Sequence, residues 1–182
     1  MQVESITSTA PISLALLRDH LRVYHTADDT NIRSALDAAV DAWDVESLRP
    51  IRDTQYSQEF DTVPAGYRFG AGPVASVDSV KWYDAETALP TTLASTKYRI
   101  AKTGSWNSLQ FLYDFASDAS EAGWWEVTWS TSWSNPTDDV IRAILMLAAT
   151  FYDERDQLTP LELRANSVGW NAIVNRYRWA TA

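Results

Sequence analysis

Cysteine is absent from this sequence of 182 residues, and histidine occurs only twice. Without cysteine the chain has no disulfide bond, no thiolate metal ligand and no cysteine nucleophile. Long apolar runs are also missing, because the nearest candidate for a membrane span, 140–152, is short and contains Arg142. The first residues show no basic segment followed by an apolar run. We therefore expect a soluble protein, inside the cell when it is made, with no membrane partner.

The composition is that of a packed globular protein, with 46% hydrophobic and 21% charged residues. A chain of this length suits one ordinary domain, or a small core that carries one inserted subdomain. Because no disulfide is available, packing alone must hold the fold.

Acidic residues outnumber basic ones, with 24 Asp and Glu against 15 Lys and Arg and a formal charge of -9. The excess lies in residues 1–54 and 55–135, each with nine acidic and five basic residues, whereas 136–182 has six and five. A protein that grips nucleic acid normally has the opposite balance on its contact face. We expect no tight DNA binding, although a weakly repelling wall lets a polyanion slide past it.

Two amphipathic helices are predicted near the start of the chain. Ser13 is placed to cap a helix over 14–22. Asp28 or Asp29 is placed to cap a second helix, whose apolar positions follow a 3.6-residue period as far as Trp43. The residues expected on its opposite, solvated face are Arg33, Ser34, Asp37, Asp41 and Asp44.

Between Thr54 and Thr131, short runs of aromatic and β-branched residues alternate with turn signals that contain glycine and proline. Trp125, Val127 and Trp129 show the alternation of a half-buried sheet. The predicted strands are 55–60, 67–69, 76–83, 97–101, 108–113 and 124–130.

A third helix is predicted from Pro136 to about Arg155, because proline suits a first turn and Asp138 and Asp139 suit the positive end of the helix dipole. Its apolar residues cover more than one face, so we expect it to be central.

This order of elements predicts an α+β fold. Two N-terminal helices and one long C-terminal helix would form a small helical core with an inserted antiparallel β subdomain. We expect one cooperative unit, divided into an N-terminal helical part (1–53), the β subdomain (54–133), and a C-terminal helix with a terminal interaction segment (134–182).

Signals for catalysis and metal binding are weak. His20 and His25 are five residues apart, whereas one face of a helix repeats every three or four residues, so we interpret them as solvated side chains near a helix end. No nucleophile elbow, P-loop or dinucleotide fingerprint is present. We therefore predict no catalytic residue, no metal, no cofactor and no enzymatic activity.

Three carboxylate pairs invite comparison with general acid-base catalysis, which needs two groups held in different environments. They fit helix ends or exposed positions better. The pairs are Asp28-Asp29, Asp138-Asp139 and Asp153-Glu154.

Nine tryptophans are an unusual number for this length. One interpretation places them in the core and at protein interfaces, where tryptophan is enriched. The other makes them stacking platforms for sugars or bases.

The C-terminal segment mixes aromatic residues with arginines, which is typical of a contact segment for a protein partner. Packing on its own subunit is the other interpretation. The candidate partner-binding residues are Trp170, Arg176, Tyr177, Arg178 and Trp179.

Several sequence motifs together resemble those of the head-tail connector (adaptor) proteins of tailed bacteriophages. The opening 11–23, with its Ser-Leu helix and His-Leu-Arg-Val phrase, leads through an acidic turn into an Ala-rich helix. The β part follows with Gly72-Pro-Val-Ala-Ser-Val, Lys97-Tyr-Arg-Ile and Val127-Thr-Trp-Ser-Thr-Ser-Trp, and 135–155 resembles the closing helix. The resemblance covers nearly the whole chain up to about Gln157. Two departures are Ser47-Leu-Arg-Pro, where relatives often have Thr-Gly-Arg, and Ser132, where relatives have glycine.

The resemblance implies a structural virion protein without catalytic residues. Its subunits would form a homo-oligomeric ring, twelve-fold like the portal, between the portal protein and a stopper or tail-completion protein, with double-stranded DNA passing through the lumen. The expected location is the virion neck, with the host cytoplasm during assembly.

Two alternatives stay open. A carbohydrate-binding β module of a virion or wall-active protein would use the tryptophans and respond to sugars. A hydrolase with paired carboxylates would depend on Asp138 and Asp139.

Overall fold

The computed structural model describes residues 1–8, 10–61, 67–103, 106–112, 122–133, 135–153 and 168–179. The chain is divided into two compact units. Unit 1 comprises 1–8, 53–132 and 179–182, and unit 2 comprises 9–52 and 133–178. The chain therefore passes between the units four times, and each unit is built from segments far apart in the sequence.

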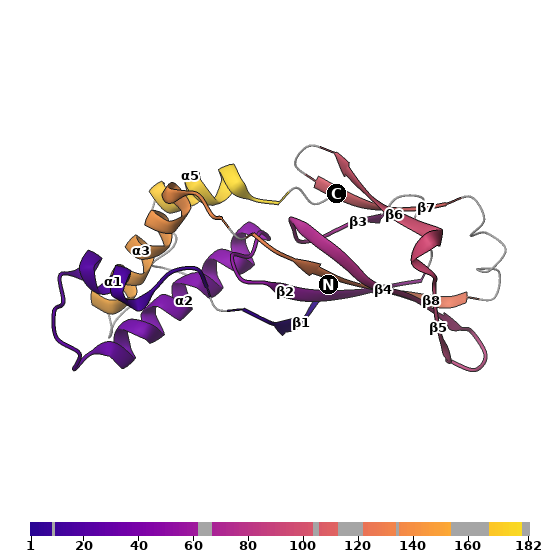
Figure 1. Cartoon of the computed structure of the whole chain (residues 1–182), viewed down its shortest axis with the longest axis horizontal. Coiled ribbons are helices and arrows are strands. Elements are labelled where there is room, and N and C mark those ends of the chain that lie inside the picture. Colours follow the sequence, from indigo (N-terminus) through magenta and orange to yellow (C-terminus); the bar gives the residue numbers. More distant parts are fainter. Residues whose placement is uncertain are drawn as a thin grey trace. The chain divides into compact units, whose positions relative to one another are not determined.

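Unit 1 contains two antiparallel sheets (Figure 1). Sheet A has the strand order β1-β2-β8-β4-β5, and sheet B has the order β3-β7-β6. The strands are β1 (Gln2–Ile6), β2 (Thr54–Phe60), β3 (Tyr67–Arg68), β4 (Val74–Asp84), β5 (Pro90–Thr92), β6 (Tyr98–Thr103), β7 (Trp106–Phe111) and β8 (Ala122–Thr131). A short 3-10 helix, η1 (Ser95–Lys97), precedes β6.

One apolar core joins the two sheets of unit 1. Trp125, Val127 and Trp129 of β8 are buried, as their alternation predicts, and Trp129 packs on Tyr56 of β2 with ring centroids 5.6 Å apart. Leu109 of β7 joins the same cluster from sheet B. Burial of large aromatic side chains is the main stabilising contribution here.

Unit 2 is helical. Its helices are α1 (Leu14–Leu21), α2 (Asp29–Ser47), α3 (Asp138–Asp153) and α5 (Val168–Tyr177). The core contains apolar residues of all four helices, and α3 contacts α1, α2 and α5. Ser13 caps α1 as predicted, since its Oγ accepts a hydrogen bond from the Leu16 N–H at 3.2 Å.

The α+β class is confirmed, and the predicted strands agree with β2, β3, β4, β6, β7 and β8 to within a few residues. The helix α5 and two strands were not predicted. The segment of β1 lacks a turn signal on either side. Pro90 was interpreted as part of a turn, but it begins β5. Proline is tolerated there because β5 is an edge strand, and the free side of an edge strand has no neighbouring strand that requires an N–H donor. The predicted ends of two elements, at Tyr113 and Arg155, lie outside the described residues.

The prediction that Asp44 lies on a solvated face was wrong. Its side chain is buried and accepts hydrogen bonds from the Ile51 N–H at 2.9 Å and from the Arg52 Nε at 2.8 Å. Burial raises the pKa of Asp44, while the Ile51 amide and Arg52 act in the opposite direction. The helical period alone does not show this, because the partners follow the helix and fold back onto it.

Asp28 precedes α2 but makes no side-chain capping bond. Its carboxylate instead accepts a hydrogen bond from the Tyr152 hydroxyl of α3 at 2.8 Å. Within the described part of the chain, no helix combines the length and the hydropathy that a membrane span requires.

Replacing Asp44 with alanine should lower the free energy of unfolding by about 2 kcal/mol, because a buried backbone N–H loses its acceptor and Arg52 loses a charged partner. Urea unfolding at pH 7 measures this. Asp41→Ala is the matched control, since Asp41 also pairs with Arg52 but its side chain is 62% exposed, and its loss should cost less than about 1 kcal/mol. Equal costs for the two variants would contradict the assignment.

Candidate partner interface

The helix α5 carries most of the predicted partner-binding residues, and Trp170 fixes its start. The indole of Trp170 is 3% exposed and meets the Trp43 ring edge-on, with centroids 5.8 Å apart. Its Nε1 donates a hydrogen bond to the Glu46 carboxylate of α2 at 2.6 Å. Trp170 therefore holds α5 against α2 within unit 2.

Tyr177 fixes the other end of α5. Its hydroxyl donates to the carboxylate of Asp139 on α3, at 2.9 and 3.1 Å from the two oxygens. Its ring lies 6.0 Å from that of Trp133. Trp133 is covered in turn by the guanidinium of Arg49, 4.3 Å above the ring. The end of α5 is thus attached to both the α3 N-terminus and the segment after α2.

The carboxylate of Asp139 is held in its ionised form. The Thr137 hydroxyl donates a hydrogen bond to it and is the main cause that lowers the pKa of Asp139. Burial raises this pKa, but Tyr177, the Val140 amide and Arg176 also lower it, so the net shift is downward. Asp139 therefore serves as a helix-terminal anchor, which is the role that its position in the first turn predicts.

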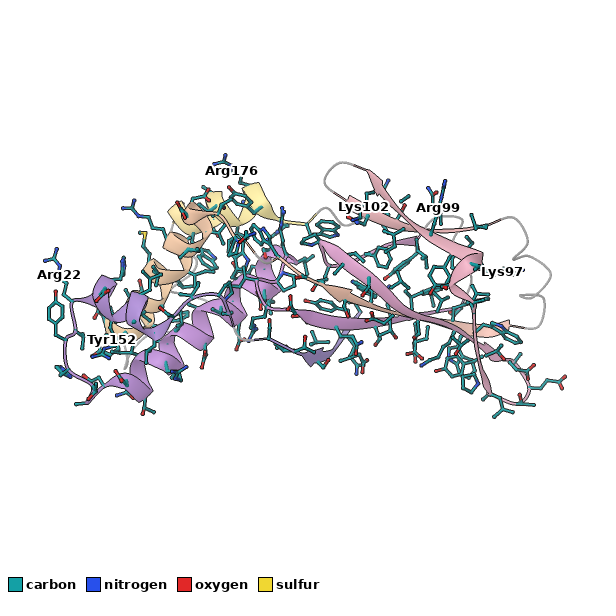
Figure 2. All side chains as sticks on the ribbon, viewed as in Figure 1. Arg22, Lys97, Arg99, Lys102, Tyr152 and Arg176 are labelled. Carbon is teal, nitrogen blue, oxygen red and sulfur yellow. The ribbon has the colours of Figure 1, made fainter. Side chains whose placement is uncertain are left out.

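Arg176 and Arg178 lie on the exposed side of this segment. The Arg176 side chain is 72% exposed, projects away from the helix in Figure 2, and approaches Asp139 only to 3.6 Å. Arg178 is also exposed. Of the five predicted partner-binding residues, these two have the most accessible side chains, and the prediction of partner binding itself stays a prediction.

Trp179 belongs to unit 1 and is buried there. Its Nε1 donates to the Phe69 carbonyl at 2.9 Å. A Cβ added to Gly72 would come within 2.4 Å of its ring, so only glycine leaves room for the indole. The sequence marks Gly72 as part of a turn, but nothing in the local pattern indicates a tryptophan 107 residues later as its neighbour.

A small groove lies between α3 and α5. Its lining residues are Ala143, Met146, Leu147, Thr150, Gly169, Trp170 and Ile173, and its volume is about 130 Å³. Pockets for small-molecule ligands typically measure about 300–1,000 Å³. The groove suits one apolar side chain better than a substrate.

The other candidate residues have structural partners or are solvated. His20 and His25 are both exposed, and no group of three or more possible metal ligands occurs among the described residues. Asp29 lies 3.5 Å from Arg18. Asp153 ends α3, and its predicted companion Glu154 lies outside the described residues.

The tryptophans are mainly interior residues. Each tryptophan whose side chain the structure describes is buried or half-buried. Trp124, one of the half-buried ones, is stacked on Tyr83 with centroids 4.7 Å apart and rings 7° from parallel. An aromatic platform for sugars needs flat, open ring faces, which none of these side chains offers in full.

No family model matches the sequence, and no curated protein matches it. Among solved structures, a chain from the neck of an empty gene transfer agent particle, computed with C6 symmetry, aligns with 100% of this chain and 97% of its own length. The TM-score is 0.74 at 20% identity. The chain has the fold of a particle-neck protein.

Two further structures of gene transfer agent particles agree. A chain from the neck of a native particle, computed with C12 symmetry, gives a TM-score of 0.71 at 20% identity, and a chain from the virion of a native particle gives 0.69 at 22%. Both alignments cover 100% of this chain and 97% of the other. The resemblance to head-tail connectors is thereby confirmed at the level of the fold.

Replacing Tyr177 with phenylalanine should lower the free energy of unfolding by about 1 kcal/mol at pH 7, since it removes the hydroxyl but keeps the ring. The pKa of Asp139 is lower in the folded chain than in the unfolded chain, so its ionised carboxylate stabilises the fold at pH values above its pKa in the unfolded chain. This contribution is lost as the pH falls through the pKa of Asp139 in the folded chain. Urea unfolding at pH 7 and pH 3 should show a smaller difference from the parent at pH 3. Tyr24→Phe is the control, because Tyr24 is 81% exposed.

Replacing Gly72 with alanine should cost about 1–3 kcal/mol through overpacking against Trp179. The clash predicts non-additivity: in the background of Trp179→Ala, the same change should cost much less. Thermal unfolding of the four combinations measures this coupling. Gly169→Ala is the control, since nothing lies within 4 Å of its added Cβ. Additive costs would argue against the contact.

Proposed function

We propose that this chain is a structural neck protein of a phage-like particle, acting as a head-tail adaptor. The observation that carries the proposal is the alignment of the entire chain with neck chains of gene transfer agent particles. The order of the connector-like phrases in the sequence supports it independently. In this role the chain catalyses nothing, and its carboxylates serve as helix anchors, as at Asp28 and Asp139.

We further propose a homo-oligomeric ring of twelve subunits that joins a portal protein to a stopper or tail-completion protein. The C6 and C12 symmetry of the neighbouring neck structures supports a ring. In a closed ring each subunit uses two different surfaces, one for each neighbour. Double-stranded DNA would pass through the lumen, and the protein would be found in the neck of the virion, after assembly in the host cytoplasm.

The portal-facing surface is proposed to include the exposed arginines at the end of α5. Trp170 and Trp179 are buried within their own units, so their part in this surface is to position Arg176 and Arg178. Arginine is enriched at protein interfaces, and a guanidinium pairs well with carboxylates of a partner.

The alternative of a carbohydrate-binding module has less support. It requires open tryptophan faces, whereas the described tryptophan side chains are buried or half-buried.

Arg176→Glu with Arg178→Glu should weaken binding of the full chain to its portal by at least tenfold and leave the free energy of unfolding nearly unchanged. Co-sedimentation with portal rings and urea unfolding measure the two effects. The matched control, Arg22→Glu with Arg33→Glu, makes the same charge change at two exposed residues, one directly after α1 and one in α2.

Unchanged portal binding in the α5 variant would contradict the proposed surface. Absence of the chain from purified particle necks, examined by cryo-electron microscopy, would contradict the proposed function as a whole.

A further inference from the structure

The two sheets of unit 1 differ sharply in charge. The strands of sheet A contain five acidic residues, Glu4, Glu59, Asp78, Asp84 and Glu126, and one basic residue, Lys81. The strands of sheet B contain Arg68, Arg99 and Lys102 and no acidic residue, and Lys97 directly precedes β6. Sheet B is therefore a positively charged region in a chain whose net charge is -9.

Three of these four cations lie on or directly before β6, which is one of the two edge strands of sheet B. Lys97, just before β6, and Arg99 and Lys102 on it follow one another in Figure 2, and we call these three residues the β6 rim. Arg99 and Lys102 are exposed and Lys97 is half-buried.

The charges of the β6 rim are not neutralised within the described part of the chain. Arg99 donates to the side-chain oxygen of Gln110 at 2.9 and 3.1 Å, a partner without charge. Lys97 and Lys102 form no ion pair with any described residue. Lys81 of sheet A, in contrast, lies 3.6 Å from Glu126.

The shape of the rim favours an extended polyanion. At about 3.3 Å per residue, Tyr98 to Lys102 spans about 13 Å, and Lys97 directly precedes this stretch. Arg99 and Lys102 are three residues apart, so their side chains alternate to opposite faces of sheet B and flank the β6 edge from both sides. Each strand of duplex DNA presents a phosphate about every 3.4 Å along the axis, so an edge of this length lies beside several phosphates. Edge-strand N–H groups without a strand partner are further donors along the same line.

A protein partner fits this rim less well. Protein interfaces usually have an apolar core surrounded by polar residues. The apolar residues of β6, Tyr98 and Ile100, are half-buried and pack against the core of unit 1 instead. The rim thus offers charge without an apolar anchor, which is the pattern of contact with a phosphate backbone.

We propose that the β6 rim is the surface through which this chain contacts the phosphates of double-stranded DNA. This rests on the proposed function, because the neck is where DNA would pass each subunit. One rim neutralises at most about three phosphates, so a single subunit binds weakly and repetition around a ring supplies the remaining affinity. The acidic residues elsewhere in the chain repel phosphates and lower the affinity, so the DNA passes the subunit without binding tightly.

The test uses the full chain immobilised at high density, with a 40-base-pair DNA duplex as probe over a range of NaCl concentrations. Replacing Lys97, Arg99 and Lys102 with glutamine should reduce duplex binding at least tenfold at the lowest salt. The slope of log K against log salt should become shallower by up to about 2.7, from three phosphates at about 0.9 each.

The matched control replaces Arg22, Arg33 and Arg142 with glutamine. All three are exposed residues of unit 2, and both triple variants change the formal charge from -9 to -12 by removing three cations. The control should retain duplex binding close to that of the parent. Urea unfolding confirms that each variant is folded.

Equal losses in the two variants would overturn the proposal, because charge alone would then explain the binding. Tighter binding of poly-glutamate than of the duplex to the parent chain would also overturn it and assign the rim to an acidic protein. Assembly of the rim variant into particle necks is measured separately. If the rim variant assembles normally and binds the duplex as tightly as the parent, the proposed DNA contact of the β6 rim is contradicted, while the proposed function is unaffected.

Discussion

Packing around the Trp43 indole is the interaction on which unit 2 depends. This ring is fully buried, donates its Nε1 hydrogen to the Arg49 carbonyl at 3.0 Å, and contacts the rings of Trp133 and Trp170. Through these contacts it joins α2, the segment entering α3, and α5. Since a chain without cysteine has no covalent cross-link to hold such distant segments together, large aromatic burial is the force available to do so.

Elements with a clear local pattern could be predicted from the sequence, and those defined by distant partners could not. Ser13 was correctly predicted as a cap because its partner is three residues away. Asp44 was wrongly placed in solvent because Arg52, which shields it, lies beyond the end of the helix. The strand β1 was missed since its pattern becomes meaningful only beside β2, more than 45 residues later.

The candidate site shows the same division. The composition of the C-terminal segment identified its aromatic and arginine residues as candidates for partner binding. The two tryptophans of this segment are nevertheless buried, because they bond to Glu46 and Phe69, both more than 100 residues earlier in the chain. The net charge likewise masked the β6 rim, because a sum over the chain does not reveal that acidic and basic residues separate onto different sheets. The predicted division into 1–53, 54–133 and 134–182, and its cooperativity, stay predictions.

The hydrogen bond from Trp179 to Phe69 has a consequence for how the protein is made. The donor is synthesised 110 residues after its acceptor. At about 5–20 residues per second, the ribosome needs roughly 6–20 s to cover that distance. During this interval the space beside Gly72 is unfilled and the core of unit 1 is incomplete. The β sheets therefore complete their packing late in translation, and until then part of the apolar core of unit 1 stays exposed, which favours aggregation over assembly.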